Sequence, residues 1–217
     1  MTWKTKPTDR FILRLIKTNL SAPISLALVR LFPGIRPGLI TVLSSSIGIS
    51  AGVAFGIGYG WLAGLLAAIA QVMDGVDGQT ARLTGKVSDQ GAFLDSVLDR
   101  YMDFALVFGI MVYCLRFSAG LEAAGFTLTS PWIVLISALA TAGSSQVSYS
   151  TARAASLGLT YRRPELACKG TRTAVVIVSG LLSPLWSPFP LLALCYLAIH
   201  PNLAVLVSLV RLLRSQK

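Results

Sequence analysis

Long, nearly uncharged apolar runs constrain the fold of this 217-residue chain more than any other feature. Hydrophobic residues make up 54% of the sequence and charged residues only 13%, whereas an average soluble domain is about 25% charged. A helix that crosses a bilayer needs about 20 mostly apolar residues, and several runs reach that length. The composition excludes a disordered chain and predicts a polytopic membrane protein rather than a soluble enzyme.

Six segments fit a membrane-spanning helix, and together they predict an all-α integral membrane protein. Pro37 suits the first turn of a helix, and Pro201 should kink the last one. We find no internal repeat in the sequence and expect residues 1–217 to form a single membrane domain. The predicted spans are 39–59, 61–84, 91–116, 131–157, 171–185 and 190–213.

Basic residues gather on one side of the predicted bundle. An even number of spans puts both termini on the same side, and 18 of the 19 Lys and Arg residues then fall there, with Arg116 as the exception. Because basic residues accumulate on the cytoplasmic side, we expect a multi-pass protein of the cell (inner) membrane with cytoplasmic termini. The net charge of +10 then reflects this bias and contact with anionic lipid, and nucleic acid is not an expected partner.

Residues 1–36 precede the first predicted span and have the pattern of an amphipathic helix. Apolar residues recur at helical spacing, and basic residues occupy the other face. We expect this segment to lie in the cytoplasmic interface, next to a six-helix bundle of residues 37–217; an unstructured basic flank is the alternative. The apolar positions include Phe11, Ile12, Leu15 and Ile16, and the basic ones are Arg10, Arg14 and Lys17.

Acidic residues concentrate where the second and third predicted spans approach each other. Asp74 and Asp77 are three residues apart and Asp95 and Asp99 are four apart, so each pair lies on one face of its helix. Between the pairs, Gly85 suits a helix C-cap and Ser88 a helix N-cap. The sequence therefore predicts an antiparallel helix pair that brings four carboxylates together near its cytoplasmic end.

Four carboxylates in a medium of low dielectric constant repel one another unless a cation lies among them or protons are shared. A site made of oxygen ligands selects hard cations such as Mg²⁺, Mn²⁺ or Ca²⁺. Four carboxylates can hold two such ions about 4 Å apart, an arrangement used to clamp phosphoryl groups. Ion pairs with Arg82 and Arg100 are the structural alternative. A cation transporter is another, although its acidic residues would be spread along a pore rather than crowded at one end.

The residues around these carboxylates resemble the signature of the CDP-alcohol phosphotransferase (CDP-alcohol phosphatidyltransferase) family. The match has no departure and spans the second predicted helix, the turn and the start of the third. The six-span layout with an interfacial N-terminal helix is also similar to that family over the whole chain. The motif reads Asp74-x2-Asp77-Gly78-x2-Ala81-Arg82-x8-Gly91-x3-Asp95-x3-Asp99.

The resemblance implies a reaction in which a phosphoryl-alcohol group passes from a CDP-linked alcohol, often CDP-diacylglycerol, to a second alcohol with release of CMP. It implies a site for two Mg²⁺ or Mn²⁺ ions held by Asp74, Asp77, Asp95 and Asp99. Asp99 would also deprotonate the acceptor hydroxyl, and a homodimer is expected. The residues implied to bind CDP are Asp77, Gly78, Ala81, Arg82 and Gly91.

The acceptor alcohol is less constrained by the sequence. Arg153, Lys169 and Arg172 stand near the cytoplasmic ends of predicted helices, where they can bind a phosphate carried by the acceptor; the positive-inside bias alone is the alternative. Upstream, this chain has Arg36-Pro37-Gly38, followed by Thr41, where many members have Thr-Pro-Asn. Residues 17–25 resemble a branch that joins CDP-inositol to inositol phosphate, and this branch remains an alternative subtype.

Overall fold

The structure is a computed structural model that describes residues 11–159 and 167–214, with the side chains of 11–13 and 123 left aside. Its described residues form helices joined by short turns, with no strand among them. The elements are α1 (Phe11–Ile16), the π-helical turn η1 (Lys17–Ser21), α2 (Ala22–Leu31), α3 (Pro37–Gly56), α4 (Gly60–Leu83), α5 (Asp89–Arg116), α6 (Ser118–Ala123), α7 (Ser130–Ser156), α8 (Lys169–Leu182) and α9 (Phe189–Arg214).

The all-α prediction is confirmed for the described residues, and each of the six predicted spans corresponds to one helix from α3 to α9, α6 excepted. The short helix α6 was not expected from the sequence. Pro201 lies inside α9 and does not end that helix. Residues 1–10 of the predicted interfacial segment lie outside the described residues.

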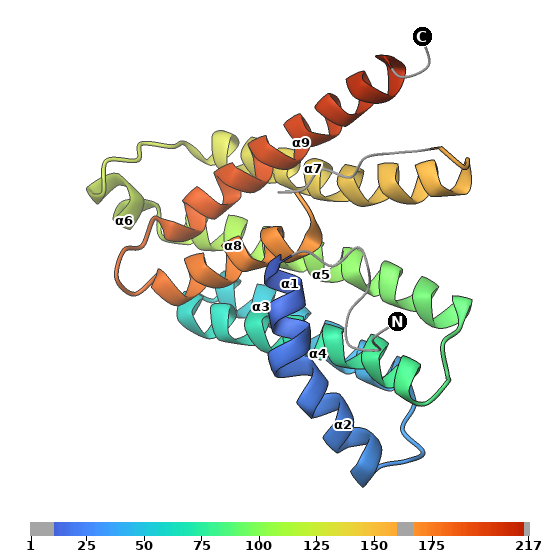
Figure 1. The fold of residues 1–217 in the computed structure, drawn as a ribbon. Helices are drawn as coiled ribbons and strands as arrows, with labels where there is room; N and C mark the ends of the chain where they lie inside the picture. The colour runs from blue at the N-terminus through green and yellow to red at the C-terminus, as the bar shows by residue number, and fades with distance from the viewer. Residues whose placement is uncertain (1–10, 160–166, 215–217) are drawn as a thin grey trace.

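Helix α3 is the common packing partner of α4 and α5, which pack mainly on it rather than on each other (Figure 1). Gly109 of α5 lies directly against Gly52 of α3, because a Cβ added at Gly109 would lie only 2.7 Å from the carbonyl carbon of Gly52. Gly64 of α4 lies equally close to α8, since a Cβ there would be 2.6 Å from the backbone nitrogen of Leu181. Small residues thus let these helices approach to backbone contact, as in membrane bundles.

The turn between α4 and α5 has the predicted caps. Gly85 has a φ of +67°, and the backbone N–H of Lys86 donates to the carbonyl of Ala81 at 2.9 Å, which closes the end of α4. The hydroxyl of Ser88 accepts a hydrogen bond from the backbone N–H of Gly91 at 3.1 Å. These two caps mark the end of α4 and the start of α5.

The distribution of side chains suits a membrane protein, because many large apolar groups are exposed while small and hydroxyl-bearing residues lie inside beside large ones such as Phe55 and Ile110. On α9, Leu203 and Leu206 are more than half exposed, and on α3 Val53 is 59% exposed. In contrast, Ala63 and Ala67 of α4 are fully buried. By length and composition, α3 and α9 of the described helices are apolar enough to cross a membrane; the count of six spans stays a prediction.

The N-terminal elements pack on α4 partly through hydroxyl groups. Ser21 donates to the carbonyl of Val72 at 2.8 Å, and Ser25 donates to the side-chain oxygen of Gln79 at 3.0 Å. Leu31 and the nearby Leu20 remain at least half exposed. This segment therefore turns polar groups inward and apolar groups outward, which suits contact with lipid; its placement in a membrane interface stays a prediction.

Candidate active site

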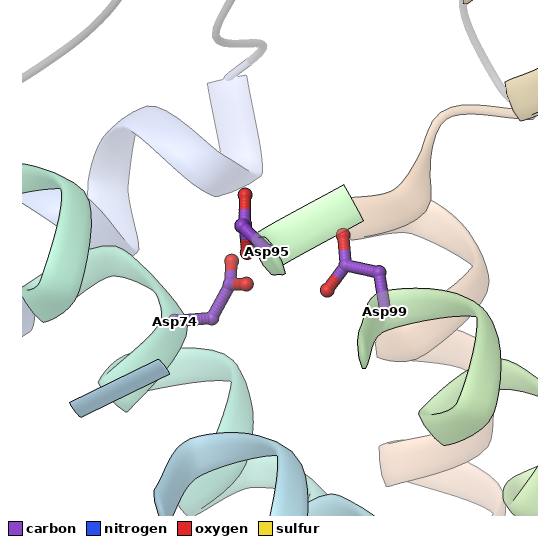
Figure 2. Close-up of side chains that lie close together, drawn as sticks. All are labelled: Asp74, Asp95 and Asp99. Carbon is purple, nitrogen blue, oxygen red and sulfur yellow. The ribbon is translucent and has the colours of Figure 1, made fainter. Parts of the chain in front are cut away.

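Three carboxylates from two helices meet near the cytoplasmic end predicted for the bundle. Asp74 comes from α4, and Asp95 and Asp99 come from α5, one turn apart (Figure 2). One oxygen of each side chain lies within 4.8 Å of one oxygen of the others, and all three residues are partly buried. The predicted convergence of the two helices is thus found for three of the four aspartates.

A lysine from a distant helix bridges two of these carboxylates. The Lys169 ammonium lies 2.7 Å from Oδ1 of Asp74 and 2.5 Å from Oδ1 of Asp99. Lys169 is the first residue of α8, which packs on α4. The structure brings its charge into the carboxylate cluster, and its predicted role in binding the acceptor stays a prediction.

Asp77 is turned away from this cluster and toward α3. Its side chain accepts a hydrogen bond from the hydroxyl of Thr41 at 2.6 Å and a second from the backbone N–H of Gly78. Asp77 is 6% exposed, so these two donors supply stabilisation that water would otherwise give its carboxylate. The sequence did not predict that Thr41 would contact Asp77. Its position one turn after Pro37, on the first predicted span, was the only indication that its hydroxyl lies near the end of the bundle that carries the aspartates.

The residues predicted to bind CDP lie in the last two turns of α4 and at the start of α5. A Cβ added at Gly78 would meet only Arg82, whose Nη1 would be 3.6 Å away, so this glycine is not required for helix packing. Ala81 and Arg82 are partly exposed on α4. Gly91 is partly exposed in the first turn of α5, where its N–H serves the Ser88 cap. Open space beside Gly78 fits a position where a ligand approaches the backbone.

The other two residues predicted to bind the acceptor are placed differently from each other. Arg172 is 3% exposed, and its guanidinium donates to Oδ2 of Asp103 at 2.9 Å and to the carbonyl of Ala167 at 2.8 Å. Arg100 also lies 3.6 Å from Asp103. Arg153 is exposed near the end of α7. The structure thus gives Arg172 a buried ion pair, and acceptor binding by Arg153 and Arg172 stays a prediction.

The chemistry of the cluster fits a divalent cation. All three donors are carboxylate oxygens, the ligands that hard cations prefer, and they come from two rigid helices. Their repulsion in a partly buried site calls for a cation, and a lysine ammonium already lies among them. Asp74, Asp95 and Asp99 are therefore the residues that would hold a metal ion.

The family model for CDP-alcohol phosphatidyltransferases matches residues 35–210 of this sequence. The chain belongs to the CDP-alcohol phosphatidyltransferase family. The resemblance seen in the motif is thereby confirmed, and the chain is an enzyme that transfers substituted phosphate groups, as members of this membrane-embedded family do. The match starts just before α3 and runs into α9, so the N-terminal helices α1 and α2 precede it.

Two relatives within this family show how far the likeness extends. The chain is 33% identical over 150 residues to the archaetidylinositol phosphate synthase of Pyrococcus horikoshii, which covers 69% of this chain and 71% of that protein. It is also 33% identical over 85 residues to the bifunctional IPC transferase and DIPP synthase of Thermococcus kodakarensis. That second match covers 39% of this chain and 17% of the relative.

The fold is shared with a solved enzyme. Crystal structures of the phosphatidylinositol phosphate synthase of Mycobacterium tuberculosis, one in complex with manganese and citrate and one with CDP-DAG bound, each match with a TM-score of 0.73 and 22% sequence identity. The alignments cover 89% of this chain and 88% and 93% of the solved chains, respectively. Most of this chain therefore has the fold of that enzyme.

Proposed function

We propose that this chain transfers a phosphoryl-alcohol group from a CDP-linked alcohol to a second alcohol and releases CMP, with a divalent metal as cofactor. The observation that carries the proposal is the meeting of Asp74, Asp95 and Asp99 within 4.8 Å in a chain of this family. The oxygen of the acceptor hydroxyl forms a bond to the phosphorus next to the donor alcohol. The bond between that phosphorus and the CMP oxygen breaks, and CMP leaves.

In this proposal Asp99 accepts the proton of the acceptor hydroxyl. Its side chain is 15% exposed, so an incoming hydroxyl can reach it. Asp74, Asp95 and Asp99, with Asp77 as a fourth candidate, would hold Mg²⁺ or Mn²⁺. When bound, the metal supplies positive charge that neutralises the diphosphate and the leaving phosphate. Manganese in the solved Mycobacterium tuberculosis enzyme supports this choice of ion.

In this proposal the donor nucleotide lies against the last two turns of α4 and the start of α5. The absence of a side chain at Gly78 lets a ligand approach the helix backbone. Arg82, one turn later, offers a planar set of N–H donors for an anionic or carbonyl-bearing group. The carboxylate of Asp77 is held by Thr41 and by the N–H of Gly78, which fixes its direction before substrate arrives.

The acceptor that best fits the relatives is a phosphorylated polyol of the inositol phosphate type, and the donor a CDP-linked lipid. The relative matched over 71% of its length is named as an archaetidylinositol phosphate synthase, and the solved structure with the same fold contains CDP-DAG. A soluble donor, CDP-inositol, is the second candidate. The match to the bifunctional IPC transferase and DIPP synthase and the resemblance of residues 17–25 favour it.

The proposed setting is the cell (inner) membrane, with six spans, cytoplasmic termini and the site at the cytoplasmic end. The single exception to the one-sided distribution of basic residues has a local role: Arg116 donates to the carbonyl of Gly56 at the end of α3 at 3.1 Å, where it caps that helix. A homodimer is the proposed oligomer, as the family resemblance implies.

The test is CMP release by the purified chain in the presence of Mg²⁺. CDP-diacylglycerol and CDP-inositol are each combined with inositol phosphate, glycerol phosphate or serine, and an Asp99→Asn variant serves as the matched control. Release that requires CDP-diacylglycerol and inositol phosphate supports the proposal. Release with CDP-inositol alone as donor assigns the second candidate. No CMP release with any pair, alongside no binding of CDP, overturns the proposed transfer.

A further inference from the structure

The Lys169 ammonium bridges α4 and α5 through two of the carboxylates that would hold a metal ion. Its Nζ is 2.7 Å from Asp74 on α4 and 2.5 Å from Asp99 on α5, while oxygens of these two residues and of Asp95 lie within 4.8 Å of one another. A lysine ammonium carries three donors and no acceptor. It therefore pairs with two of the three carboxylates that a metal would need.

We propose that Lys169 is an internal competitor of the divalent metal: its ammonium holds the Asp74–Asp99 pair in the metal-free enzyme and leaves that pair when metal binds. A metal ion and an ammonium on the same two carboxylates would lie close together, and their positive charges repel at such distances. The inference rests on the metal-dependent transfer proposed above.

The local structure allows the lysine side chain to move while its helix stays in place. Lys169 is the first residue of α8, and its charge is carried on a flexible four-carbon stem. One turn further along α8, Arg172 is fixed by its buried contacts with Asp103 and the carbonyl of Ala167. Exchange of cations therefore requires a swing of one side chain rather than a shift of α8.

Once displaced, the ammonium remains at the edge of a partly buried site, where an unpaired charge is costly. An anion brought by the substrate, such as the donor diphosphate or an acceptor phosphate, relieves that cost. Lys169 thus links the loading of metal to the binding of a phosphate group. The side chain performs both roles because it exchanges one anionic partner for another.

The first test measures Mn²⁺ binding to the purified full chain by electron paramagnetic resonance, without nucleotide. Lys169→Met removes the competitor and should bind Mn²⁺ about tenfold more tightly than the wild type, within the usual range for coupled sites. Lys86→Met is the matched control, because Lys86 donates to the carbonyl of Ile35 at 3.1 Å and its loss changes the net charge equally. An unchanged or weaker affinity in Lys169→Met overturns the inference while leaving the metal site intact. Absence of Mn²⁺ binding in both the wild type and Lys169→Met overturns the metal site as well.

The second test uses the wild-type chain and does not depend on a variant that folds. Lysines are acetylated with an amine-reactive ester, with and without Mn²⁺, and the rate at each lysine is read by mass spectrometry. Mn²⁺ should raise the rate at Lys169 about tenfold and leave the rate at Lys86 unchanged. A rate at Lys169 that is unaffected by Mn²⁺ at concentrations where the ion is bound contradicts the inference.

Discussion

Arg172 and Asp103 form a buried ion pair one helical turn beyond the contact between Lys169 and Asp99. The guanidinium of Arg172 lies 2.9 Å from Oδ2 of Asp103, so two ion pairs join α8 to α5 in succession. Both partners of the second pair are largely shielded, with exposed fractions of 3% and 14%. This pair fixes the start of α8 relative to α5 and so determines where Lys169 can reach.

Replacement of Arg172 by Met should therefore destabilise the fold. The change leaves the carboxylate of Asp103 without its principal partner, and loss of one member of a buried pair costs about 3 kcal/mol of the free energy of unfolding. Thermal unfolding of the purified protein measures the effect. The double variant Arg172→Met with Asp103→Leu should recover much of it. A raised KM for the acceptor with unchanged thermal stability would instead indicate that Arg172 binds the acceptor.

Thr41→Val should weaken donor binding and leave the helices intact. The variant keeps the shape of the side chain but removes the donor to Asp77, and a hydrogen bond to a charged group is worth about 1.5–3 kcal/mol. We expect a fall of about tenfold or more in CDP affinity, measured by calorimetry. Thr41→Ser retains the hydroxyl and should behave like the wild type; equal affinities for the Val and Ser variants would exclude this role.

Gly78 and Gly109 should respond to alanine in opposite ways. A methyl group at Gly78 meets only the tip of Arg82, and alanine favours a helix over glycine by about 1 kcal/mol, so Gly78→Ala should retain or gain thermal stability while CDP binding falls. A methyl group at Gly109 runs into the backbone of Gly52 and should lower the unfolding temperature. Loss of stability in both variants would show that Gly78 is a packing residue.

Asp99→Asn should abolish turnover while leaving CDP binding largely in place. The amide retains the shape of the side chain but cannot take the acceptor proton, and such groups contribute about 10²- to 10⁴-fold to a rate. Asp89→Asn is the control, since Asp89 is an exposed residue in the first turn of α5. Initial rates of CMP release give the answer, and a turnover of the Asp99→Asn variant close to that of wild type would remove Asp99 from the mechanism.

Chelation should stop the reaction reversibly. EDTA removes a divalent ion held by Asp74, Asp95 and Asp99, and CMP release should fall to background and return when Mg²⁺ or Mn²⁺ is added in excess. Adding Ca²⁺ in place of Mg²⁺ tests the geometry of the site. If Ca²⁺ does not restore CMP release, the site needs the octahedral geometry that Mg²⁺ prefers. Turnover that persists after exhaustive chelation would contradict a metal-dependent transfer.

Local features of the site could be predicted from the sequence because they depend on short spacings. The separation of Asp95 and Asp99 places both on one helix face, and the turn chemistry of Gly85 and Ser88 placed the ends of α4 and α5 correctly. The family motif added the reaction class. The inferences from spacing and from caps use residues within about one or two helical turns of each other.

Long-range partners could not be derived in this way. Lys169 is 70 residues beyond Asp99 in the sequence, and nothing in the spacing of charges indicates that α8 packs on α4. Positive-inside bias offered an equally good account of Lys169 and Arg172. The direction of Asp77 was missed for the same reason, because Thr41 belongs to another helix and is 36 residues away.

The contact of Gly52 with Gly109 has a mechanical consequence for the part of the carboxylate site that lies further along the same two helices. No side chain separates the two helices at this point, so neither compression of the bundle nor the choice of a different rotamer can change their spacing. Helices α3 and α5 should then behave as one stiff body when bilayers of different thickness or lateral pressure surround them. Detergents or lipids of varied chain length are expected to leave the arrangement of Asp95 and Asp99 relative to Thr41 unaltered.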